Sequence, residues 1–252
     1  MTAMRTLVRL AAAIPLLFAS VGASPPDSLV SLGGHWHCTV AGGRPAERSY
    51  FVMSAQLGLN PGRREVFGRE DTTEPDGAPS TSFERMYETG GGVAVSAVEG
   101  RGIAADAAGS LRFAGRTYDG GETMELTYTV AGDAMRRIAK RGSAIVDDET
   151  CSREAETPDV AACPRPNVPA QTVRTLEPEY PVDAYVAKVK GVVLVRVVLD
   201  DRSRVLWADI VRSASPLLNE VAIHAARGST FRTEIRTCRP VASEYVFSVD
   251  FE

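Results

Sequence analysis

The sequence predicts a two-domain protein in which an all-β antiparallel meander or barrel precedes a small α+β domain. Short alternating segments separated by glycines fill residues 30–152, and prolines interrupt residues 153–177. Residues 178–252 then combine long apolar strands with one helical pattern. A chain of 252 residues, 44% hydrophobic and 24% charged, has the composition and length of two ordinary folded domains.

The first 23 residues have the pattern of a secretory signal peptide. Arg5 and Arg9 precede an apolar run over residues 10–19, and Val21, Gly22 and Ala23 supply the small residues of a cleavage site. The run is about half as long as a membrane-spanning helix requires, which favours a cleaved signal over an anchor. We therefore expect an exported mature protein. The alternative is a membrane-anchored form that retains residues 1–23.

The first domain, residues 30–152, reads as a series of short strands. Residues 123–130 alternate clearly, with Met124, Leu126 and Tyr128 on one face and threonines on the other. Eight strands are predicted, at residues 35–40, 48–56, 64–69, 82–88, 93–98, 110–116, 123–130 and 135–140. About eight antiparallel strands can close into a barrel whose interior is either filled by side chains or left as a cavity.

Gly34, His35 and Trp36 open this domain with a Gly-x-Trp pattern. This start resembles that of lipocalin-like barrels, in which the tryptophan plugs one end of the barrel. The resemblance implies a barrel that holds a small apolar ligand. A filled barrel that serves as a structural spacer is the alternative.

Candidate metal and catalytic groups were sparse in the sequence. His35 and His37 share one face of a strand, but no third histidine completes a metal site, so exposed or rim histidines are favoured. The acidic run at residues 147–149 lacks the spaced ligands of a calcium loop and predicts a solvated turn. No nucleophile elbow, phosphate loop, dinucleotide fingerprint or zinc-protease motif is present. We expect no enzymatic activity, no cofactor and no metal.

The four cysteines fit an exported protein with two internal disulfides. Three pairings are formally possible, and the one that respects the domain division joins Cys38 to Cys151 and Cys163 to Cys238. Each bond would stabilise the fold by roughly 3 to 5 kcal/mol in the loop-entropy model. The spacings do not match a zinc site.

Residues 153–177 form a proline-rich connector, which should be extended and have no core of its own. The formal net charge of −4 gives no indication of nucleic-acid binding.

The last domain, residues 178–252, alternates strand and helix patterns. A valine-rich run at residues 191–199 and a second strand at residues 204–212 predict a hairpin. Ser215 and Pro216 predict the start of a helix, and Gly228 its end. The apolar stripe of this helix comprises Leu217, Leu218, Val221, Ala222 and Ala225.

The order of these elements resembles the C-terminal domain of the TonB family of energy transducers, over residues of about 176–252. The residues that carry the resemblance are Glu177, Pro178, Glu179, Tyr180, Pro181, Ala184, Gly191, Val192, Val193, Val211, Ser213, Leu217, Ala222, Phe231, Arg239, Pro240 and Val241. The resemblance implies a periplasmic domain that pairs an edge strand with an extended segment of an outer-membrane receptor. Such pairing is β-augmentation, in which main-chain hydrogen bonds supply affinity.

The corresponding edge strand in this chain covers residues 243–250. The partner-binding residues that the resemblance implies are Tyr180, Pro181, Tyr245, Val246, Phe247, Ser248 and Val249. A strand that merely finishes the sheet, or one that forms a homodimer edge, is the alternative.

The chain departs from the family because it has no recognisable uncleaved anchor or long proline-rich spacer. The favoured hypothesis is therefore a periplasmic, non-enzymatic binding or adaptor protein that contacts an outer-membrane receptor or another envelope protein. One alternative is a barrel-based carrier of a small apolar ligand. Another is a membrane-anchored energy transducer for outer-membrane transport, if the signal remains uncleaved.

Overall fold

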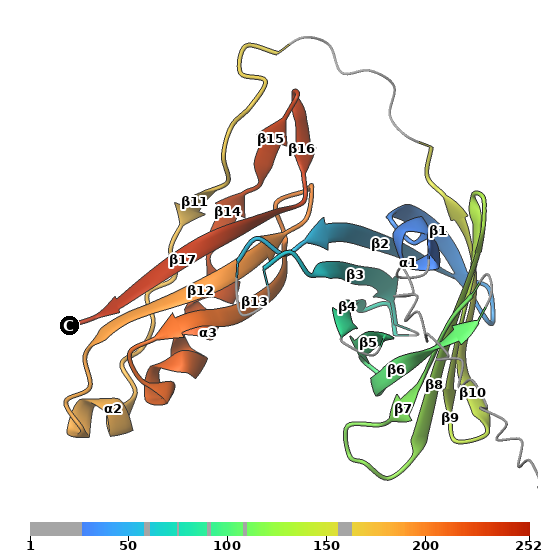
Figure 1. The fold of residues 1–252 in the computed structure, drawn as a ribbon, viewed down its shortest axis with the longest axis horizontal. Helices are drawn as coiled ribbons and strands as arrows, with labels where there is room; N and C mark the ends of the chain where they lie inside the picture. Colours follow the sequence, from blue (N-terminus) through green and yellow to red (C-terminus); the bar gives the residue numbers. More distant parts are fainter. Residues whose placement is uncertain (1–26, 58–60, 75, 90–91, 108–109, 156–162) are drawn as a thin grey trace, which may run out of the picture.

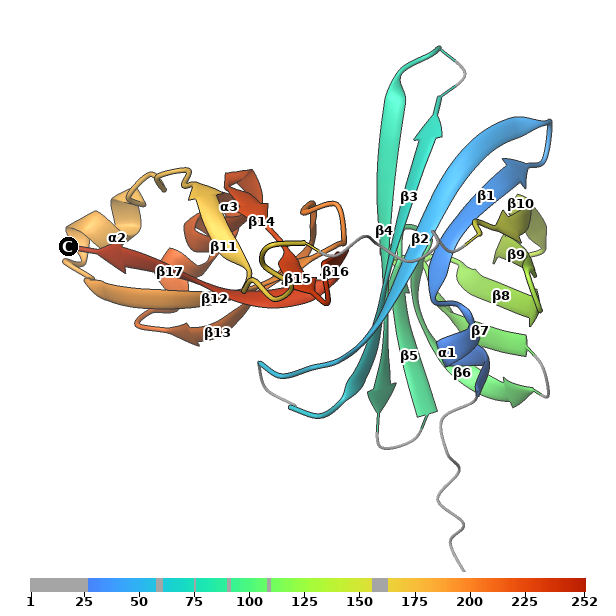
Figure 2. The same cartoon turned by 90° about the horizontal axis from the view of Figure 1, so that it is seen from above.

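The protein consists of a closed ten-stranded β-barrel and a small α+β domain that lies against the outside of the barrel (Figures 1 and 2). The computed structural model describes residues 27–57, 61–74, 76–89, 92–107, 110–155 and 163–252. The predicted signal peptide lies outside these residues. Within them, no helix is both long and apolar enough to cross a membrane.

The barrel is an antiparallel meander in which every strand pairs with its neighbours in sequence. Its strands are β1 (Gly34–Val40), β2 (Arg44–Ser54), β3 (Arg64–Thr73), β4 (Pro79–Thr89), β5 (Gly92–Ala97), β6 (Gly100–Ala107), β7 (Ser110–Arg116), β8 (Thr123–Ala131), β9 (Ala134–Arg141) and β10 (Ala144–Arg153). Pairing of β1 with both β2 and β10 closes the cylinder. Closure leaves no unpaired barrel edge for another chain to join.

The prediction of eight strands was wrong by two, because β6 and β10 were missed. In β6, glycine and alanine dominate, and these residues lack the bulky side chains that mark a strand in sequence. Glycine is required next to it, since a Cβ on Gly115 of β7 would lie 1.8 Å from the carbonyl oxygen of Arg101. In β10, acidic residues at inward positions concealed the strand.

One end of the barrel is closed by the short helix α1 (Asp27–Ser31). Leu29, Leu32 and Trp36 are fully buried there, and the indole N–H of Trp36 donates to the carbonyl of Leu32 at 2.8 Å. The guanidinium of Arg153 lies 4.0 Å from the centre of the Trp36 ring. This tryptophan plug agrees with the lipocalin-like start of the sequence.

Each structural unit contains one disulfide bond. Cys38 on β1 is bonded to Cys151 on β10, across the seam that closes the barrel, and Cys163 is bonded to Cys238. These are the two pairs that respect the domain division. The second bond fastens the C-terminal part of the connector to the α+β domain.

The α+β domain contains a sheet of three strands in the order β13-β12-β17. Its elements are β11 (Gln171–Arg174), α2 (Val182–Val186), β12 (Gly191–Leu199), β13 (Val205–Ser213), a 3₁₀ turn (Pro216–Leu218), α3 (Asn219–Gly228), β14 (Thr230–Arg232), β15 (Glu234–Arg236), β16 (Arg239–Val241) and β17 (Ser243–Phe251). Helix α3 covers one face of this sheet (Figure 1). Strands β11 and β14 pair separately, so part of the predicted connector packs on this domain.

The ends of α3 follow the sequence only in part. The hydroxyl of Ser215 accepts a hydrogen bond from the N–H of Leu217 at 3.3 Å, but one 3₁₀ turn precedes the α-helix, and Leu217 is exposed. Gly228 ends the helix without a left-handed backbone. A Cβ added at this position would lie 2.4 Å from a methyl group of Leu176, so close packing requires glycine there.

We expect that the Cys38–Cys151 bond contributes about 4 to 5 kcal/mol to barrel stability, since it spans 113 residues. Replacing both cysteines with alanine should lower the free energy of unfolding by up to that amount. Urea unfolding followed by Trp36 fluorescence measures it, with Trp207→Phe introduced into both proteins so that only the barrel reports. An unchanged urea midpoint would contradict a stabilising role for this bond.

Candidate functional site

The predicted edge strand, β17, is an outer strand of its sheet. All nine of its residues are in register with β12, from Ser243 opposite Leu199 to Phe251 opposite Gly191. Among the described residues, no other strand pairs with β17. Its second edge therefore offers backbone N–H and C=O groups to an added strand.

The side chains of β17 alternate between the domain core and the surface. Phe247 and Val249 are buried in the domain core, with 4% and 5% of their surface exposed. Val246, Ser248 and Asp250 are exposed on the opposite face of the sheet. An added strand would use the backbone of the whole segment, but only the exposed side chains can contact a partner directly.

The other predicted partner-binding residues belong to the packing of the domain itself. The Tyr180 hydroxyl donates to the carbonyl of Val189, and its ring lies 5.6 Å from that of Phe251. Pro181 precedes α2 as its N-cap residue. The Tyr245 hydroxyl is 3.2 Å from that of Thr172 on β11. These contacts hold β17 from the core side. A partner-binding role for Tyr180, Pro181 and Tyr245 remains a prediction.

A surface groove of about 520 Å³ lies beside the first half of β17. Tyr245 and Val246 of β17 line one side, and Val168 and Pro169 of the connector line another. Leu57, from the turn between β2 and β3, also lines it. The barrel therefore contributes to the surface that surrounds the edge strand.

An apolar cluster joins the two structural units. Phe67, on the outside of β3, is buried together with Val198 of β12 and Leu206 of β13. Phe51, Met53 and Trp207 pack around them. In β3 the alternation places Val66 inside the barrel and Phe67 outside, so the strand is buried on both faces.

A buried ion cluster lies at the centre of this interface. Arg196, the only charged residue in β12, has 1% of its surface exposed. Its guanidinium lies 2.8 Å from Glu65 of β3, 2.8 Å from Asp209 of β13 and 3.1 Å from Glu244 of β17. Burial raises the pKa of Glu65, but hydrogen bonds from Arg85 and Arg196 outweigh it and hold the pKa below its ordinary value.

Polar contacts surround this cluster. The backbone N–H groups of Gln56 and Leu57 donate to the Glu244 carboxylate at 3.0 and 2.9 Å. Arg204 lies 3.0 Å from Asp71 of β3. Glu244 thus connects the first residues of β17 both to Arg196 and to the barrel. Nothing in the sequence indicates this role, because Glu244 lies among alternating strand residues like any exposed glutamate.

The two histidines of β1 lie on the outside of the barrel, as their spacing predicted, but they have separate partners. His35 contacts Ser49 and, across the interface, Asp201, each at 2.8 Å. His37 is exposed and lies 2.8 Å from Glu47, whose hydrogen bond and charge raise the pKa of the histidine. His35 therefore contributes to docking of the α+β domain.

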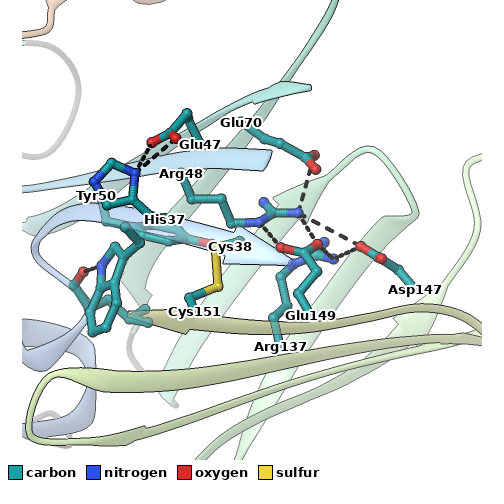
Figure 3. The surroundings of a disulfide bond; sticks show 12 residues. His37, Cys38, Glu47, Arg48, Tyr50, Glu70, Arg137, Asp147, Glu149 and Cys151 are labelled. Carbon is teal, nitrogen blue, oxygen red and sulfur yellow. Dashed lines mark hydrogen bonds and ion pairs between the residues drawn. A yellow bond between two sulfur atoms is a disulfide. The ribbon is translucent and has the colours of Figure 1, made fainter. Parts of the chain in front are cut away.

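A second ion cluster lies inside the barrel, next to the Cys38–Cys151 bond (Figure 3), together with an apolar cluster of side chains. Arg48 binds Glu149 through two hydrogen bonds of 2.5 Å. Arg137 lies 2.7 Å from Glu84 and 2.8 Å from Asp147. The interior is thus charged at its centre, which is unfavourable for an apolar ligand.

Two tyrosines complete this cluster. Tyr50 and Tyr128 donate to the same oxygen of Glu84, at 3.1 and 2.9 Å. Burial would raise the pKa of Glu84, but Arg137 and Arg48 lower it below its ordinary value. Burial also raises the pKa of both tyrosines. Their hydroxyls therefore remain donors at neutral pH and satisfy a buried carboxylate.

The acidic run at residues 147–149 is a barrel strand, so its prediction as a solvated turn was wrong. Asp147 and Glu149 belong to the interior cluster, and Asp148 lies outside, where it binds Arg136 at 2.8 Å. Burial, followed by a hydrogen bond to Glu149, raises the pKa of Asp147 to about 8. Glu149 is held at a pKa of about 2, because its contacts with Arg48 outweigh the effect of burial. The pair shares one proton at neutral pH.

The described residues contain one group of side chains with the spacing of metal ligands, namely Cys38, Cys151 and Glu149. The disulfide bond between the two cysteines removes both thiolates (Figure 3). This group cannot hold a metal while the bond is intact.

Comparison with known families decides the nature of the second unit. Residues 177–252 match the family described as Gram-negative bacterial TonB protein C-terminal. The α+β unit is a TonB C-terminal domain. No curated protein matches the chain. The match begins at residue 177, after β11, so the barrel with its interior ion cluster lies outside it.

The proton shared inside the barrel predicts a pH-dependent stability. Folded Asp147 retains its proton up to about pH 8, whereas its ordinary pKa is 3.8, so the free energy of unfolding should fall as pH rises between these values. The slope has an upper limit of about 1.4 kcal/mol per pH unit. Asp147→Asn should flatten this slope and raise the melting temperature at pH 8 relative to the wild type.

Asp148→Asn is the matched control, because Asp148 is on the same strand but outside the barrel, and its pKa lies below the ordinary value. Melting temperatures measured from pH 5 to pH 8.5 compare the three proteins. Parallel curves for wild type and Asp147→Asn would show that the interior carboxyl group does not hold this proton.

Arg196 should determine how the TonB C-terminal domain docks on the barrel. Arg196→Ala leaves Asp209 and Glu244 without their buried cation, which typically costs about 3 to 5 kcal/mol. We expect a larger radius of gyration in small-angle X-ray scattering and two separate transitions in calorimetry. Asp71→Asn weakens the partly exposed rim contact with Arg204, which keeps its pairing with Asp200, and should cost less than about 1 kcal/mol. Equal effects of the two substitutions would contradict a central role for Arg196.

Proposed function

We propose that the protein is a non-enzymatic adaptor of the bacterial envelope, which binds an extended segment of an outer-membrane receptor or another envelope protein through β17. The observation that carries this proposal is the unpaired edge of β17 in a TonB C-terminal domain. Main-chain hydrogen bonds from this edge would provide affinity. The exposed side chains of Val246 and Ser248 would provide selectivity.

The barrel supports this function by fixing the position of the first residues of β17. Glu244 receives two barrel N–H groups and one guanidinium contact, so the start of β17 is fastened to the β2–β3 turn. The groove beside Val246 is then a preformed recess in which a partner side chain can sit. A strand that is already ordered loses less entropy when a partner binds.

The contents of the barrel favour an adaptor over a carrier of apolar ligands. Arg48, Arg137 and Glu84 occupy the interior with at most 2% of their surface exposed. An apolar ligand among these groups would have to break charged hydrogen bonds without replacing them. The barrel is better suited to act as a rigid body that presents its outer surface.

A periplasmic location follows from the same proposal. Outer-membrane receptors expose their extended segments on that side, and disulfide bonds such as Cys163–Cys238 persist in an oxidising compartment. Energy transduction would in addition require residues 1–23 to remain as an anchor. Intact mass measured on protein from the cell envelope distinguishes these forms.

Site-specific photo-crosslinking tests the proposed edge. A benzoylphenylalanine placed at Ser248, on β17, should form adducts with envelope proteins in living cells, and Val246→Pro should abolish them because proline removes a backbone donor. The same group at Arg212 provides the matched control, since this exposed residue lies on β13 at the opposite edge of the sheet.

Circular dichroism of Val246→Pro establishes whether the domain remains folded. Adducts formed equally from both edges, or from β13 alone, would exclude β17 as the binding strand whatever the proline variant does.

A further inference from the structure

A second surface groove, of about 760 Å³, lies on the outer face of strands β4 to β7. Its floor is made of small residues, among them Ala94, Ser96 and Ala114. Trp207 of the TonB C-terminal domain lines the same groove. Docking of the second unit therefore adds a wall to a groove of the barrel surface, and the size of the groove is that of sites for small molecules.

Three arginines line this groove in register. Arg85 of β4 is opposite Ser96 of β5, Ser96 is opposite Arg101 of β6, and Arg101 is opposite Arg116 of β7. Neighbouring strands lie about 4.8 Å apart, so the row places three guanidinium groups within about 15 Å of one another. Their like charges repel unless an anion lies between them.

Two of these arginines lack the carboxylate partner that most barrel arginines have. The barrel arginines within ion-pair distance of a carboxylate are Arg48, Arg63, Arg64, Arg69, Arg85, Arg112, Arg136, Arg137, Arg141 and Arg153. In the described part of the chain, Arg101 has the ring of Tyr118 at 5.4 Å, and Arg116 donates to the carbonyl of Gly120. Among the described residues, no carboxylate lies within ion-pair distance of either guanidinium.

Aromatic side chains provide the remaining walls. Tyr87 and Trp207 flank Arg85, whose guanidinium lies 5.2 and 5.0 Å from their ring centres. Arg85 is itself neutralised by Glu65 at 2.5 Å, so the groove has a neutral aromatic side and a cationic side. A ligand that suits both sides has a flat apolar body and one anionic group.

We propose that this groove binds a small anionic molecule with an aromatic or other flat apolar body. Its carboxylate, sulfonate or phosphate group lies between Arg101 and Arg116. Its flat body rests on the small residues of β5 and β7 and contacts Trp207 and Tyr87. Because Trp207 belongs to the TonB C-terminal domain, the bound molecule touches both structural units.

Fluorescence titration of the full-length mature protein with anilinonaphthalene sulfonate tests this proposal. The probe has a sulfonate on a flat aromatic body, and N-phenylnaphthylamine provides a similar body without the charge. We expect saturable sulfonate binding with energy transfer from Trp207, which Trp207→Phe removes. The double variant Arg101→Gln/Arg116→Gln should weaken the sulfonate affinity by at least about tenfold, and N-phenylnaphthylamine should not respond to it.

Arg112→Gln is the matched control, since Arg112 is exposed on the outer face of β7, like Arg116, but pairs with Glu125 at 2.5 Å. It should change the affinity by less than about twofold. Absence of saturable binding, equal effects of both sets of substitutions, or unchanged affinity in the double variant would overturn the proposal. Binding of tetraglutamate with the same arginine dependence, without sulfonate binding, would replace the small molecule by an acidic peptide.

Discussion

The contact between Arg196 and Glu65 is the interaction on which the arrangement of the whole protein depends. A guanidinium in the middle of a valine-rich strand can be buried only if carboxylates surround it, because an unpaired buried charge is very unfavourable. Arg196 finds Asp209 and Glu244 within its own sheet and Glu65 on the barrel. The contacts with Asp209 and Glu244 lie within one sheet, so the contact with Glu65 is the one that joins the buried guanidinium to the barrel. It adds a directional contact to the apolar packing of Phe67 with Val198.

Strand alternation explains how a single barrel can serve two purposes. Along β3, Val66 and Glu70 point inward while Glu65, Phe67 and Asp71 point outward to the TonB C-terminal domain. The inward residues build a buried, ion-paired interior, and the outward residues build a docking surface. One period-two pattern therefore specifies both the barrel interior and the docking surface. The barrel therefore contacts the TonB C-terminal domain through its outer surface, while its interior is occupied by its own side chains.

The same docking shapes the two surface grooves. The groove beside β17 includes Leu57 of the barrel, and the groove on β4 to β7 includes Trp207 of the TonB C-terminal domain. Each site is completed by a residue of the other unit. Binding at either groove would consequently favour the docked arrangement, since a ligand stabilises the state that it binds. The two proposed sites are linked through the interface that contains Arg196.

The local elements and the family of the last domain can be recognised in the sequence alone. The period of Met124, Leu126 and Tyr128, the cap at Ser215 and the spacing from Glu177 to Val241 depend on neighbouring residues, so they can be read from a linear pattern. Only the tertiary structure decided that residues 147–149 form an inner strand and that Arg196 joins two units. A buried charge and an exposed charge look alike in sequence, because the partners that neutralise Glu149 and Arg196 come from strands distant in the chain.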